Sequence, residues 1–526
     1  PAARPWHIAT TSAWRRCEHP APGLAGIVGR GYYRGLSDRN QAMTNQPNII
    51  IFIADQWRGD WTGAATHPFI RTPRFDAIAE DGVIFNQAFT THPICGPSRC
   101  SFCTGWYPHT RGHRSQEHLI RQDEPHLLKY LTNAGYHIAW GGKNDMLEKD
   151  LVEQTVDTRL GVSSPVTLWG ENPYAPDDDR FYSFYFGPIE GDAEQHRDVQ
   201  VTRAAQRFLR SPPDQPFCLW VNLTFPHPPY AAPEPWASMY GVDEVDDPIA
   251  VDNEGVPSYL AQLNRHARLD RCDAEHLRKM RAMYAGMISM VDALFGDLVD
   301  TMHEQNLGDD TAVFCLSDHG NYAGDYGCPE KWHTAVHDAI SRVPLGVRLP
   351  GGEGKAGVSE ALAQHIDVFA TVLHLAGVKP DWPHFGQSLL PVVRGEADEL
   401  RDAVFIDCGA NLPHELPYAI ARTKMPEIPV DSPYYPFYLT FTECPEAASR
   451  TLMVREHRWK YVWRQSDVDE LYDLETDPNE TRNLLTADGG SRADPAIVAR
   501  LRDRLLRWSV ESGDTMPVGI NQDAYP

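Results

Sequence analysis

The sequence predicts an α/β protein in which a large sheet flanked by helices is followed by a smaller antiparallel sheet covered by one helix. Two observations lead to this class. From residue 48 onward, apolar runs of strand length alternate with segments of helical periodicity, which is the pattern of an α/β sheet. With 526 residues, the chain is also long enough for one large core and a smaller second unit.

The expected elements follow the chain in order. Short apolar runs between turn residues predict strands, and apolar residues at intervals of three and four predict helices. Segment 273–304 is the clearest helix, because its methionines Met283, Met287 and Met290 share one face, which we interpret as core. The strands are expected at 48–54, 137–141, 217–223, 312–317, 345–349, 403–407, 451–455 and 459–464, and the helices at 74–81, 124–134, 198–210, 273–304, 366–376 and 494–511.

The segment before the first strand does not fit this alternation. Met43 is followed almost at once by the strand at 48–54. We therefore interpret residues 1–43 as an N-terminal extension or artefact and residues 44–395 as the main, catalytic α/β domain. A polar, glycine-containing stretch then separates residues 396–526, which we expect to form a smaller C-terminal α+β subdomain.

Composition and charge restrict the partners. The chain has 72 acidic and 48 basic residues, and its net charge of −24 argues against nucleic acid or an anionic membrane surface. No apolar run reaches the roughly 18–20 residues that span a bilayer. The ten cysteines have no framework spacing, and Cys218 and Cys315 lie in apolar runs typical of buried thiols. Because residues 1–42 also lack a sustained apolar stretch with a cleavage site, we expect a cytoplasmic protein.

Residues 95–108 carry the most specific chemistry. A first-turn proline and a Thr-Gly stop predict a helix with Cys95 at its N-terminus, where free backbone N–H groups favour an anion. Arg99 lies one turn on and can share the same face. The alternatives are a structural zinc site formed with Cys100 and Cys103, or simply buried thiols. Zinc is disfavoured because no second cysteine or histidine pair lies nearby.

This segment resembles the signature of the type I sulfatases, Cys-x-Pro-Ser-Arg-x-x-x-Leu-Thr-Gly, with Cys103 in the leucine position. In that family the cysteine is oxidised to formylglycine, so the resemblance implies that Cys95 is catalytic and is matured by a formylglycine-generating enzyme. It covers most of residues 46–482. It also implies the alkaline phosphatase-like fold of arylsulfatases and phosphonate monoester hydrolases, with a large mixed central sheet. The matching residues are Cys95, Pro97, Ser98, Arg99, Thr104 and Gly105.

The resemblance extends to a metal site. Asp55 and Gln56 follow the first strand, and Asp318 and His319 follow the fourth, so these side chains are expected at one rim of the sheet. In the family these positions, with the modified Cys95, hold a divalent cation. Gln56 stands where many sulfatases have aspartate and related phosphonate monoester hydrolases have glutamine. Oxygen-rich ligation favours Ca²⁺ and leaves Mn²⁺ or Mg²⁺ open. Taken alone, each motif is typical of a surface turn.

Three further side chains match family positions. Lys143 follows a strand and matches a lysine that binds the sulfate, and Lys331 matches a second lysine near the leaving-group oxygen. His227 matches a family histidine, although a packed loop histidine is the alternative. Many sulfatases carry a histidine two residues after the first lysine, where this chain has Asp145. Either His333 or another histidine replaces it, or the substrate geometry differs.

The resemblance therefore implies the hydrolysis of sulfate monoesters, through a formylglycine at Cys95 and a divalent cation. The expected substrate is a sulfated carbohydrate or an aryl sulfate, and a homo-oligomer is expected. One alternative is a phosphonate monoester hydrolase or phosphodiesterase of the same superfamily, which Gln56 and His319 favour. The other is a non-catalytic binding protein with an unmodified Cys95. The loop aromatics that can stack on sugar rings are Trp169, Tyr174, Tyr230, Tyr434 and Tyr435.

Overall fold

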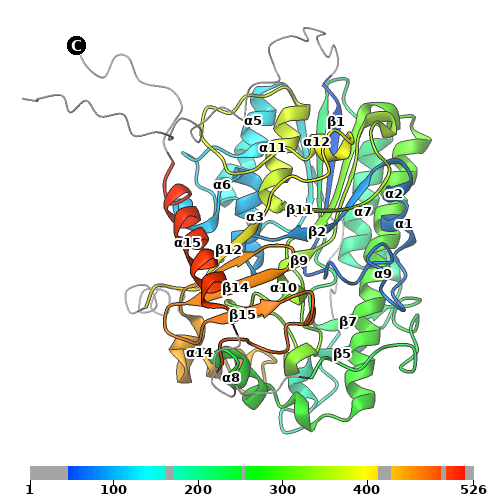
Figure 1. The fold of residues 1–526 in the computed structure, drawn as a ribbon. Helices are drawn as coiled ribbons and strands as arrows, with labels where there is room; N and C mark the ends of the chain where they lie inside the picture. The colour runs from blue at the N-terminus through cyan, green and yellow to red at the C-terminus, as the bar shows by residue number, and fades with distance from the viewer. Residues whose placement is uncertain (1–45, 162–169, 251–254, 413–427, 487–492, 516–526) are drawn as a thin grey trace, which may run out of the picture. The chain divides into compact units, whose positions relative to one another are not determined.

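A computed structural model describes the chain from residue 46 onward (Figure 1). The described residues are 46–161, 170–250, 255–412, 428–486 and 493–515, and they belong to one compact unit. The boundaries expected at residues 43 and 395 stay predictions. Trp169, one of the aromatic residues considered for substrate stacking, lies outside the described residues.

The central sheet is mixed, as predicted. Its strand order is β11-β2-β10-β8-β1-β6-β3-β4, with β9 paired to β2. Strand β1 runs parallel to β6 and β8, whereas β10 runs antiparallel to β8. The strands are β1 Asn48–Ala54, β2 Val83–Phe89, β3 His137–Gly142, β4 Thr158–Leu160, β6 Phe217–Asn222, β8 Thr311–Ser317, β9 Arg342–Val343, β10 Leu345–Arg348 and β11 Gly357–Gln364.

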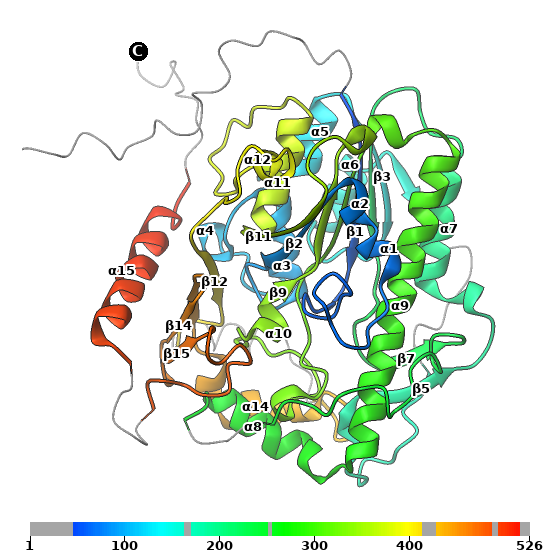
Figure 2. The same ribbon diagram turned by 45° about the vertical axis from the view of Figure 1, so that its right-hand side comes forward.

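Helices cover both faces of this sheet (Figures 1 and 2). On one face α3 (Cys95–Thr104), α5 (Leu127–Asn133) and α11 (His365–Leu375) enclose an apolar core, and on the other α7 (Arg197–Leu209) and α9 (Ala274–Glu304) enclose a second core. The shorter helices are α1 Pro73–Asp76, α2 Ile78–Asp81, α4 Pro108–Arg111, α6 Lys149–Thr155, α8 Ser258–Ala267, α10 Asp338–Ser341, α12 Leu390–Val393 and α14 Tyr435–Glu443.

Helix α9 carries the methionine stripe expected from the sequence. Met283, Met287 and Met290 are at most 2% exposed, which confirms them as core residues. By length and composition α9 could cross a membrane, but 83% of its apolar window is buried inside the protein. We therefore describe α9 as the core helix of a globular fold.

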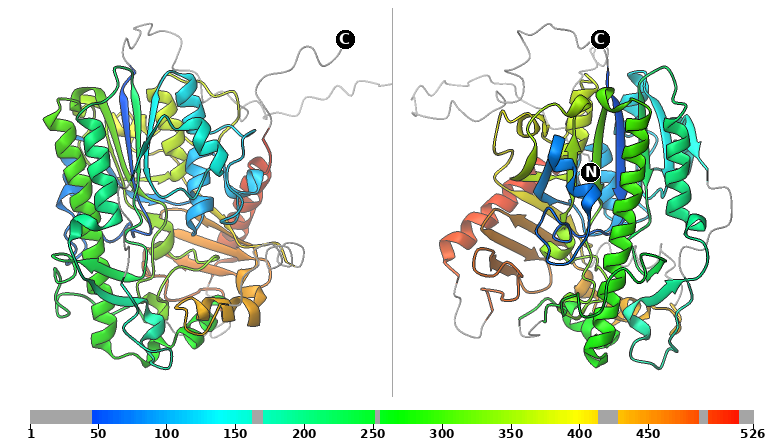
Figure 3. Two further views of the ribbon diagram at one scale, coloured as in Figure 1. Left: turned by 180° about the vertical axis from the view of Figure 1, so that it is seen from behind. Right: turned by 90° about the vertical axis from the view of Figure 1, so that its right-hand side faces the viewer.

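The C-terminal part contains the expected small antiparallel sheet. Its order is β12-β13-β14-β15, and α15 (Pro495–Glu511) covers its outer face (Figure 3). The ring of Trp508 on α15 stacks on Phe405 at 4.9 Å between ring centroids. The strands are β12 Val404–Cys408, β13 Thr451–Arg455, β14 Trp459–Arg464 and β15 Glu470–Asp473, and a separate pair is formed by β5 Tyr185–Ile189 and β7 Tyr230–Pro233.

The elements missed from the sequence are short or only partly buried. All eight predicted strands form, with bounds that differ by at most one residue at either end. The sequence did not predict β2, β4, β5, β7, β9, β11 or β15. Strand β11 has an exposed first half, so it lacks the continuous apolar run that marks a buried strand. The helix expected at 74–81 breaks into α1 and α2 at Ala77.

A buried histidine predicts how the stability of this fold depends on pH. His337 is 4% exposed and its Nδ1 atom lies 2.7 Å from the Tyr322 hydroxyl. Burial, with Lys460 and Arg464 nearby, lowers its pKa to about 3. Since the unfolded pKa is about 6.5, its contribution to stability is complete above pH 6.5 and is lost as the pH falls toward 3.

We therefore expect His337→Gln to reduce the loss of unfolding free energy between pH 7 and pH 5 by about 2 kcal/mol, as measured by urea unfolding at both pH values. The control is His457→Gln on the surface, where the histidine side chain is 48% exposed. An equal pH dependence in wild type and His337→Gln would contradict this expectation.

Candidate active site

Two aspartates meet at the carboxyl edge of the central sheet because β1 and β8 pair in register. Ala54 is the last residue of β1 and lies opposite Ser317, the last residue of β8. Asp55 and Asp318 therefore follow two adjacent strands at the same edge of the sheet. Both side chains are completely buried. The Asp318 N–H donates to the Ala54 carbonyl at 3.3 Å, which fixes the second carboxylate beside the first. The prediction that both aspartates share one rim is confirmed.

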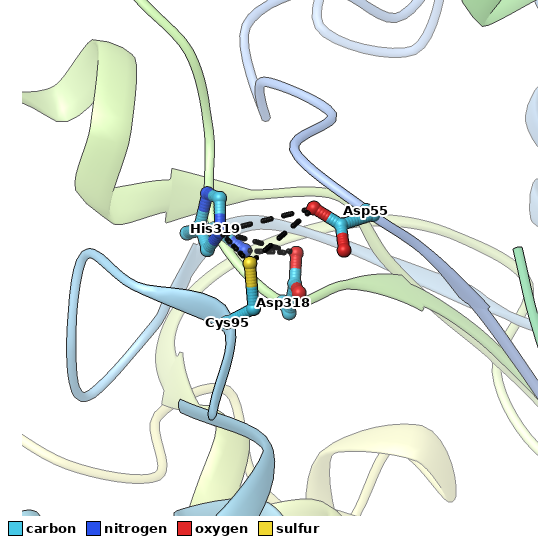
Figure 4. Close-up of side chains that lie close together, drawn as sticks. All are labelled: Asp55, Cys95, Asp318 and His319. Carbon is cyan, nitrogen blue, oxygen red and sulfur yellow. Dashed lines mark hydrogen bonds and ion pairs between the residues drawn. The ribbon is translucent and has the colours of Figure 1, made fainter. Parts of the chain in front are cut away.

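Helix α3 brings Cys95 to the same edge. The helix begins at Cys95 and ends before Gly105, whose φ of 71° is the left-handed conformation that closes helices. The Cys95 Sγ atom lies 3.6 Å from Asp55 Oδ1 and 3.2 Å from His319 Nε2. One ligand atom each from Cys95, Asp55, Asp318 and His319 lies within 4.8 Å of the others (Figure 4).

This cluster fits a divalent cation. The His319 Nδ1–H donates to the Gly320 carbonyl at 2.9 Å, so the Nε2 lone pair faces the cluster. Burial lowers the pKa of His319, with Lys331 adding to the effect, and the imidazole stays neutral, which is the form that ligates metals. Two buried carboxylates at such close range repel each other unless cations lie between them. The donor set of oxygen, nitrogen and the Cys95 position therefore suits a metal ion.

Gln56 lies beside the cluster in a strained conformation. Its φ of 75° is in the left-handed region, and its backbone N–H donates to Asp318 Oδ1 at 3.0 Å. Its side-chain oxygen accepts from Lys331 Nζ at 2.5 Å. Gln56 therefore links Asp318, through its backbone N–H, to Lys331 on the opposite side of the site, through its side-chain oxygen.

Arg99 bridges the two aspartates. Its Nε donates to Asp318 at 2.8 Å, one terminal nitrogen donates to Asp55 at 3.2 Å, and the other donates to Asn222 Oδ1 at 3.0 Å. Three of its five N–H groups are thereby used, which leaves two for a bound oxyanion. The Gly96 N–H, which the sequence leaves free for an anion at the start of α3, donates to Gln116 at 2.7 Å instead.

Lys143 and Asp145 form the more exposed side of the site. Lys143 follows β3, and its Nζ lies 2.5 Å from Asp55 Oδ2 and 2.7 Å from Asp145 Oδ2. The side chains of Lys143 and Asp145 are 21% and 22% exposed, whereas Asp55 is fully buried. The residue that replaces the family histidine is therefore an ion-pair partner of the lysine. His333, which the sequence offered as a replacement, is exposed.

Lys331, His227 and Glu330 form the opposite side. Lys331 Nζ lies 2.7 Å from Glu330 Oε1 and 3.0 Å from His227 Nε2. The His227 Nδ1–H donates to the Pro228 carbonyl at 2.5 Å, so its Nε2 is the acceptor for Lys331. Burial, followed by Lys331, lowers the pKa of His227 to about 4. The proton between these two residues therefore resides on the lysine.

Charge partners keep the buried groups ionised. Burial opposes ionisation of Asp55, but the cationic Lys143 and Arg99 outweigh it and hold its pKa well below the ordinary value. Burial lowers the pKa of Lys331, and Glu330 outweighs it, so the pKa is raised and the ammonium persists. For Cys95, burial and then Asp55 raise the thiol pKa to about 12. With its pKa raised in this way, an unmodified Cys95 is a protonated thiol and a weak nucleophile.

Sequence reasoning missed Glu330 and Asn222. Glu330 directly precedes Lys331 and is 3% exposed, and Asn222 ends β6 at the same rim as Asp55. A polar residue at the end of a buried strand is a signal that could have found Asn222. Tyr434, at the start of α14, was considered only for stacking. It lies beside Glu330, and burial followed by this carboxylate raises its pKa well above the ordinary value.

Other candidate residues lie elsewhere. Cys100 and Cys103 are buried in the apolar core under α3, and of the three clustered thiols only Cys95 belongs to the metal-type cluster among the described residues. Tyr230 is fully buried and its hydroxyl donates to the Pro329 carbonyl, so it is a packing residue.

This fold, with this arrangement at its edge, places the chain among the hydrolases of the alkaline phosphatase-like superfamily. The family model described as Sulfatase matches residues 47–378. The chain therefore belongs to the sulfatase family and is a sulfuric ester hydrolase that acts on sulfate monoesters.

Its relatives agree with this assignment. A choline-sulfatase of Rhizobium meliloti (strain 1021) is 27% identical over 498 residues, covering 90% of this chain and 88% of that protein. Arylsulfatase K of Gallus gallus is 24% identical and covers 87% of this chain and 82% of its own. The solved structure of the phosphonate monoester hydrolase SpPMH from Silicibacter pomeroyi has the same fold, with a TM-score of 0.70, 23% identity, and coverage of 89% of this chain and 96% of that one.

The cluster geometry predicts the metal dependence of the protein. We expect Asp318→Asn to weaken binding of a divalent cation at least about 10-fold, because it removes one of two ligand charges. The measurement is metal content by mass spectrometry after dialysis against a buffered Ca²⁺ concentration. The matched control is Asp407→Asn, which removes another fully buried carboxylate outside the cluster. Equal metal content in the two variants would rule out the assigned site.

Proposed function

We propose that Cys95 is converted to formylglycine and that the modified side chain is the nucleophile for sulfate ester hydrolysis. The observation that carries this proposal is the position of the Cys95 side chain. It lies within 4 Å of both Asp55 and His319, at the first residue of a buried helix. A hydrated aldehyde at this position would supply a nucleophilic oxygen, and a cation held by Asp55, Asp318 and His319 would favour its deprotonation.

The remaining residues bind and orient the ester. The two unused N–H groups of Arg99 and the ammonium of Lys143 face the position of the non-bridging oxygens, where negative charge collects in the transition state. Lys331 holds a proton on the opposite side, and His227 accepts a hydrogen bond from it. We assign Lys331 as the general acid for the leaving oxygen and His227 as the residue that orients it.

For the cation, we propose Ca²⁺, with Mn²⁺ or Mg²⁺ as alternatives. Asp55, Asp318 and the Gln56 amide supply oxygen ligands, which suit Ca²⁺, while His319 supplies one nitrogen. Gln56 is completely buried, and its side-chain nitrogen has no hydrogen-bond partner among the described residues. A cation at the cluster would compete with Lys331 for the oxygen of this amide.

The substrate we propose is a sulfated carbohydrate or an aryl sulfate. Because two of the relatives are named choline-sulfatase and arylsulfatase K, choline sulfate and aryl sulfates are both included in the substrates to be tested. Tyr434 lies on the Lys331 side and its ring contacts Phe184 at 4.8 Å. An aromatic ring beside the leaving-group position can pack against a sugar or an aryl group.

Hydrolysis of phosphonate monoesters or phosphodiesters is the second candidate. It is favoured by one observation: Gln56 supplies an amide where many sulfatases have a carboxylate, and it contacts Lys331 directly. The neutral Gln56 side chain gives the cation site one negative charge fewer than an aspartate would, which makes the electrostatic potential at the transferred group more positive. The likeness of fold to a phosphonate monoester hydrolase agrees with this candidate but does not distinguish it.

We also propose the maturation and location of the protein. A formylglycine-generating enzyme would act on Cys95, and the buried reduced cysteines support a cytoplasmic location. Self-association is supported by α15, where Leu506 and Val510 are 64% and 73% exposed. Two large apolar side chains one turn apart on an outer helix are a usual component of a contact between copies.

The test of this function begins with the side chain at position 95. We expect mass spectrometry of the active protein to show the peptide containing Cys95 with formylglycine, and Cys95→Ala to lose at least about 1000-fold in kcat/KM. The assay panel comprises p-nitrophenyl sulfate, sulfated sugars, choline sulfate, a phosphodiester and a phosphonate monoester. Full activity with an unmodified thiol would refute the mechanism, and a higher kcat/KM on the phosphonate would favour the second candidate.

The assigned general acid predicts a dependence on the leaving group. We expect Lys331→Ala to lower kcat/KM about 100-fold or more for alkyl sulfates and much less for p-nitrophenyl sulfate, whose phenolate leaves without a proton. His227→Gln should show the same leaving-group dependence with a smaller loss, because His227 acts through Lys331. Lys279→Ala, at a lysine that is 46% exposed, is the control. If His227→Gln shows the leaving-group dependence and Lys331→Ala does not, the two roles are reversed.

A further inference from the structure

Asp145 differs from the other carboxylates of the site. Among the described residues, Asp55, Asp318 and Glu330 are at most 3% exposed, and the first two belong to the metal-type cluster. The Asp145 side chain is 22% exposed and lies outside that cluster. It is therefore the carboxylate of the site that the metal ligands do not require and that faces incoming solutes.

The loop that follows β3 holds Asp145 in place. The Asn144 side chain donates to the Leu147 carbonyl at 2.9 Å and accepts from the Leu147 N–H at 3.1 Å, so the turn is closed on both sides. Within this turn, the Asp145 carboxylate reaches Lys143 Nζ at 2.7 Å, while Asp55 holds the same ammonium at 2.5 Å. Lys143, which faces the ester oxygens, thus carries a carboxylate on each side.

The charges of the site nearly cancel. The imidazoles of His227 and His319 are counted as neutral, because each donates its Nδ1–H to a backbone carbonyl, the His227 Nε2 accepts from Lys331, and the His319 Nε2 faces the cluster. The cationic side chains are Arg99, Lys143 and Lys331, and the anionic ones are Asp55, Asp318, Glu330 and Asp145. Four negative charges against three positive ones leave a net charge of −1, and a divalent cation changes it to +1.

We propose that Asp145 is a specificity residue that matches the site to monoanions and weakens the binding of dianions. This inference rests on the proposed function. With the cation bound, a monoanionic sulfate ester brings the site to zero net charge, whereas a dianion leaves an excess of −1. Without the Asp145 carboxylate, the dianion would be the neutral match. The field of Asp145 acts where the ester oxygens bind, because it contacts the ammonium that holds them.

The proposed preference for monoanions over dianions also affects the release of the product. Hydrolysis converts a monoanionic ester and water into an alcohol, a proton and sulfate, which is a dianion. The product therefore carries one more negative charge than the substrate at the same position. By repelling that extra charge, Asp145 favours release of inorganic sulfate, and it excludes phosphate monoesters, which are dianions at neutral pH.

The test uses two non-reactive probes of similar size on the cation-loaded protein, methanesulfonate as the monoanion and inorganic sulfate as the dianion. Isothermal titration calorimetry at pH 8 gives the Kd of each. We expect Asp145→Asn to bind methanesulfonate about 3-fold and sulfate about 10-fold more tightly than wild type, because a dianion feels twice the effect of removing one charge. Asp145→Glu, which keeps the charge, should stay within about 2-fold of wild type for both.

Glu117→Gln is the matched control, because it removes an exposed carboxylate from the neighbouring loop and should leave both Kd values unchanged. Metal content and circular dichroism verify each variant, and Asp145→Ser replaces Asp145→Asn if the latter does not fold. Equal changes for the two probes, or no change, would overturn the inference.

The outcome is separable from that of the proposed function. A wild-type protein that does not hydrolyse sulfate esters would refute the function, whereas the ratio of the two Kd values would still report on Asp145. Conversely, a fully active sulfatase with an unchanged ratio in Asp145→Asn would refute only this inference.

Discussion

The ion pairs of Arg99 with Asp55 and Asp318 are the interaction on which the rest of the site depends. Parallel pairing of β1 and β8 forces two carboxylates together in a fully buried position, and such a pair is unstable unless cationic groups compensate for it. Arg99 supplies that compensation from the helix that also carries Cys95. The same contacts therefore stabilise the edge of the sheet and fix the position of Cys95 relative to Asp55 and Asp318.

The chemistry is divided between the two sides of this pair. In the proposed mechanism Lys143, directly after β3, binds the oxygens that stay with sulfur, and Lys331, which contacts His227 and Glu330, protonates the oxygen that leaves. Each lysine is held by a carboxylate within 3 Å, so neither ammonium needs to be repositioned when the ester binds. Because each buried cation is paired with a carboxylate, the site can hold positive charge for an anionic ester although the net charge of the protein is −24.

Much of this site could be predicted from the sequence, because its main residues follow strands or open a helix. Asp55 and Asp318 end apolar runs, and Cys95 precedes a helix with a clear Thr-Gly stop, so local signals were enough to place them. The signals failed where position depends on contacts distant in the chain. Nothing near Glu330 indicates that Tyr434 will lie beside it, and nothing near Lys143 shows that its ammonium will lie between Asp145 and the distant Asp55. Strand β11 was missed for a related reason, since its pairing with β2 and not its own composition makes it a strand.

The burial of α3 determines when Cys95 can be modified. All ten residues of this helix are buried, and Cys95 itself is 1% exposed, beneath the chain segments that complete the sheet edge. In the folded protein the Cys95 side chain is therefore almost inaccessible to another protein. If Cys95 is modified as proposed, the modifying enzyme would have to reach it before α3 packs against the sheet, and a chain that folded first would keep an unmodified thiol behind the same buried surface.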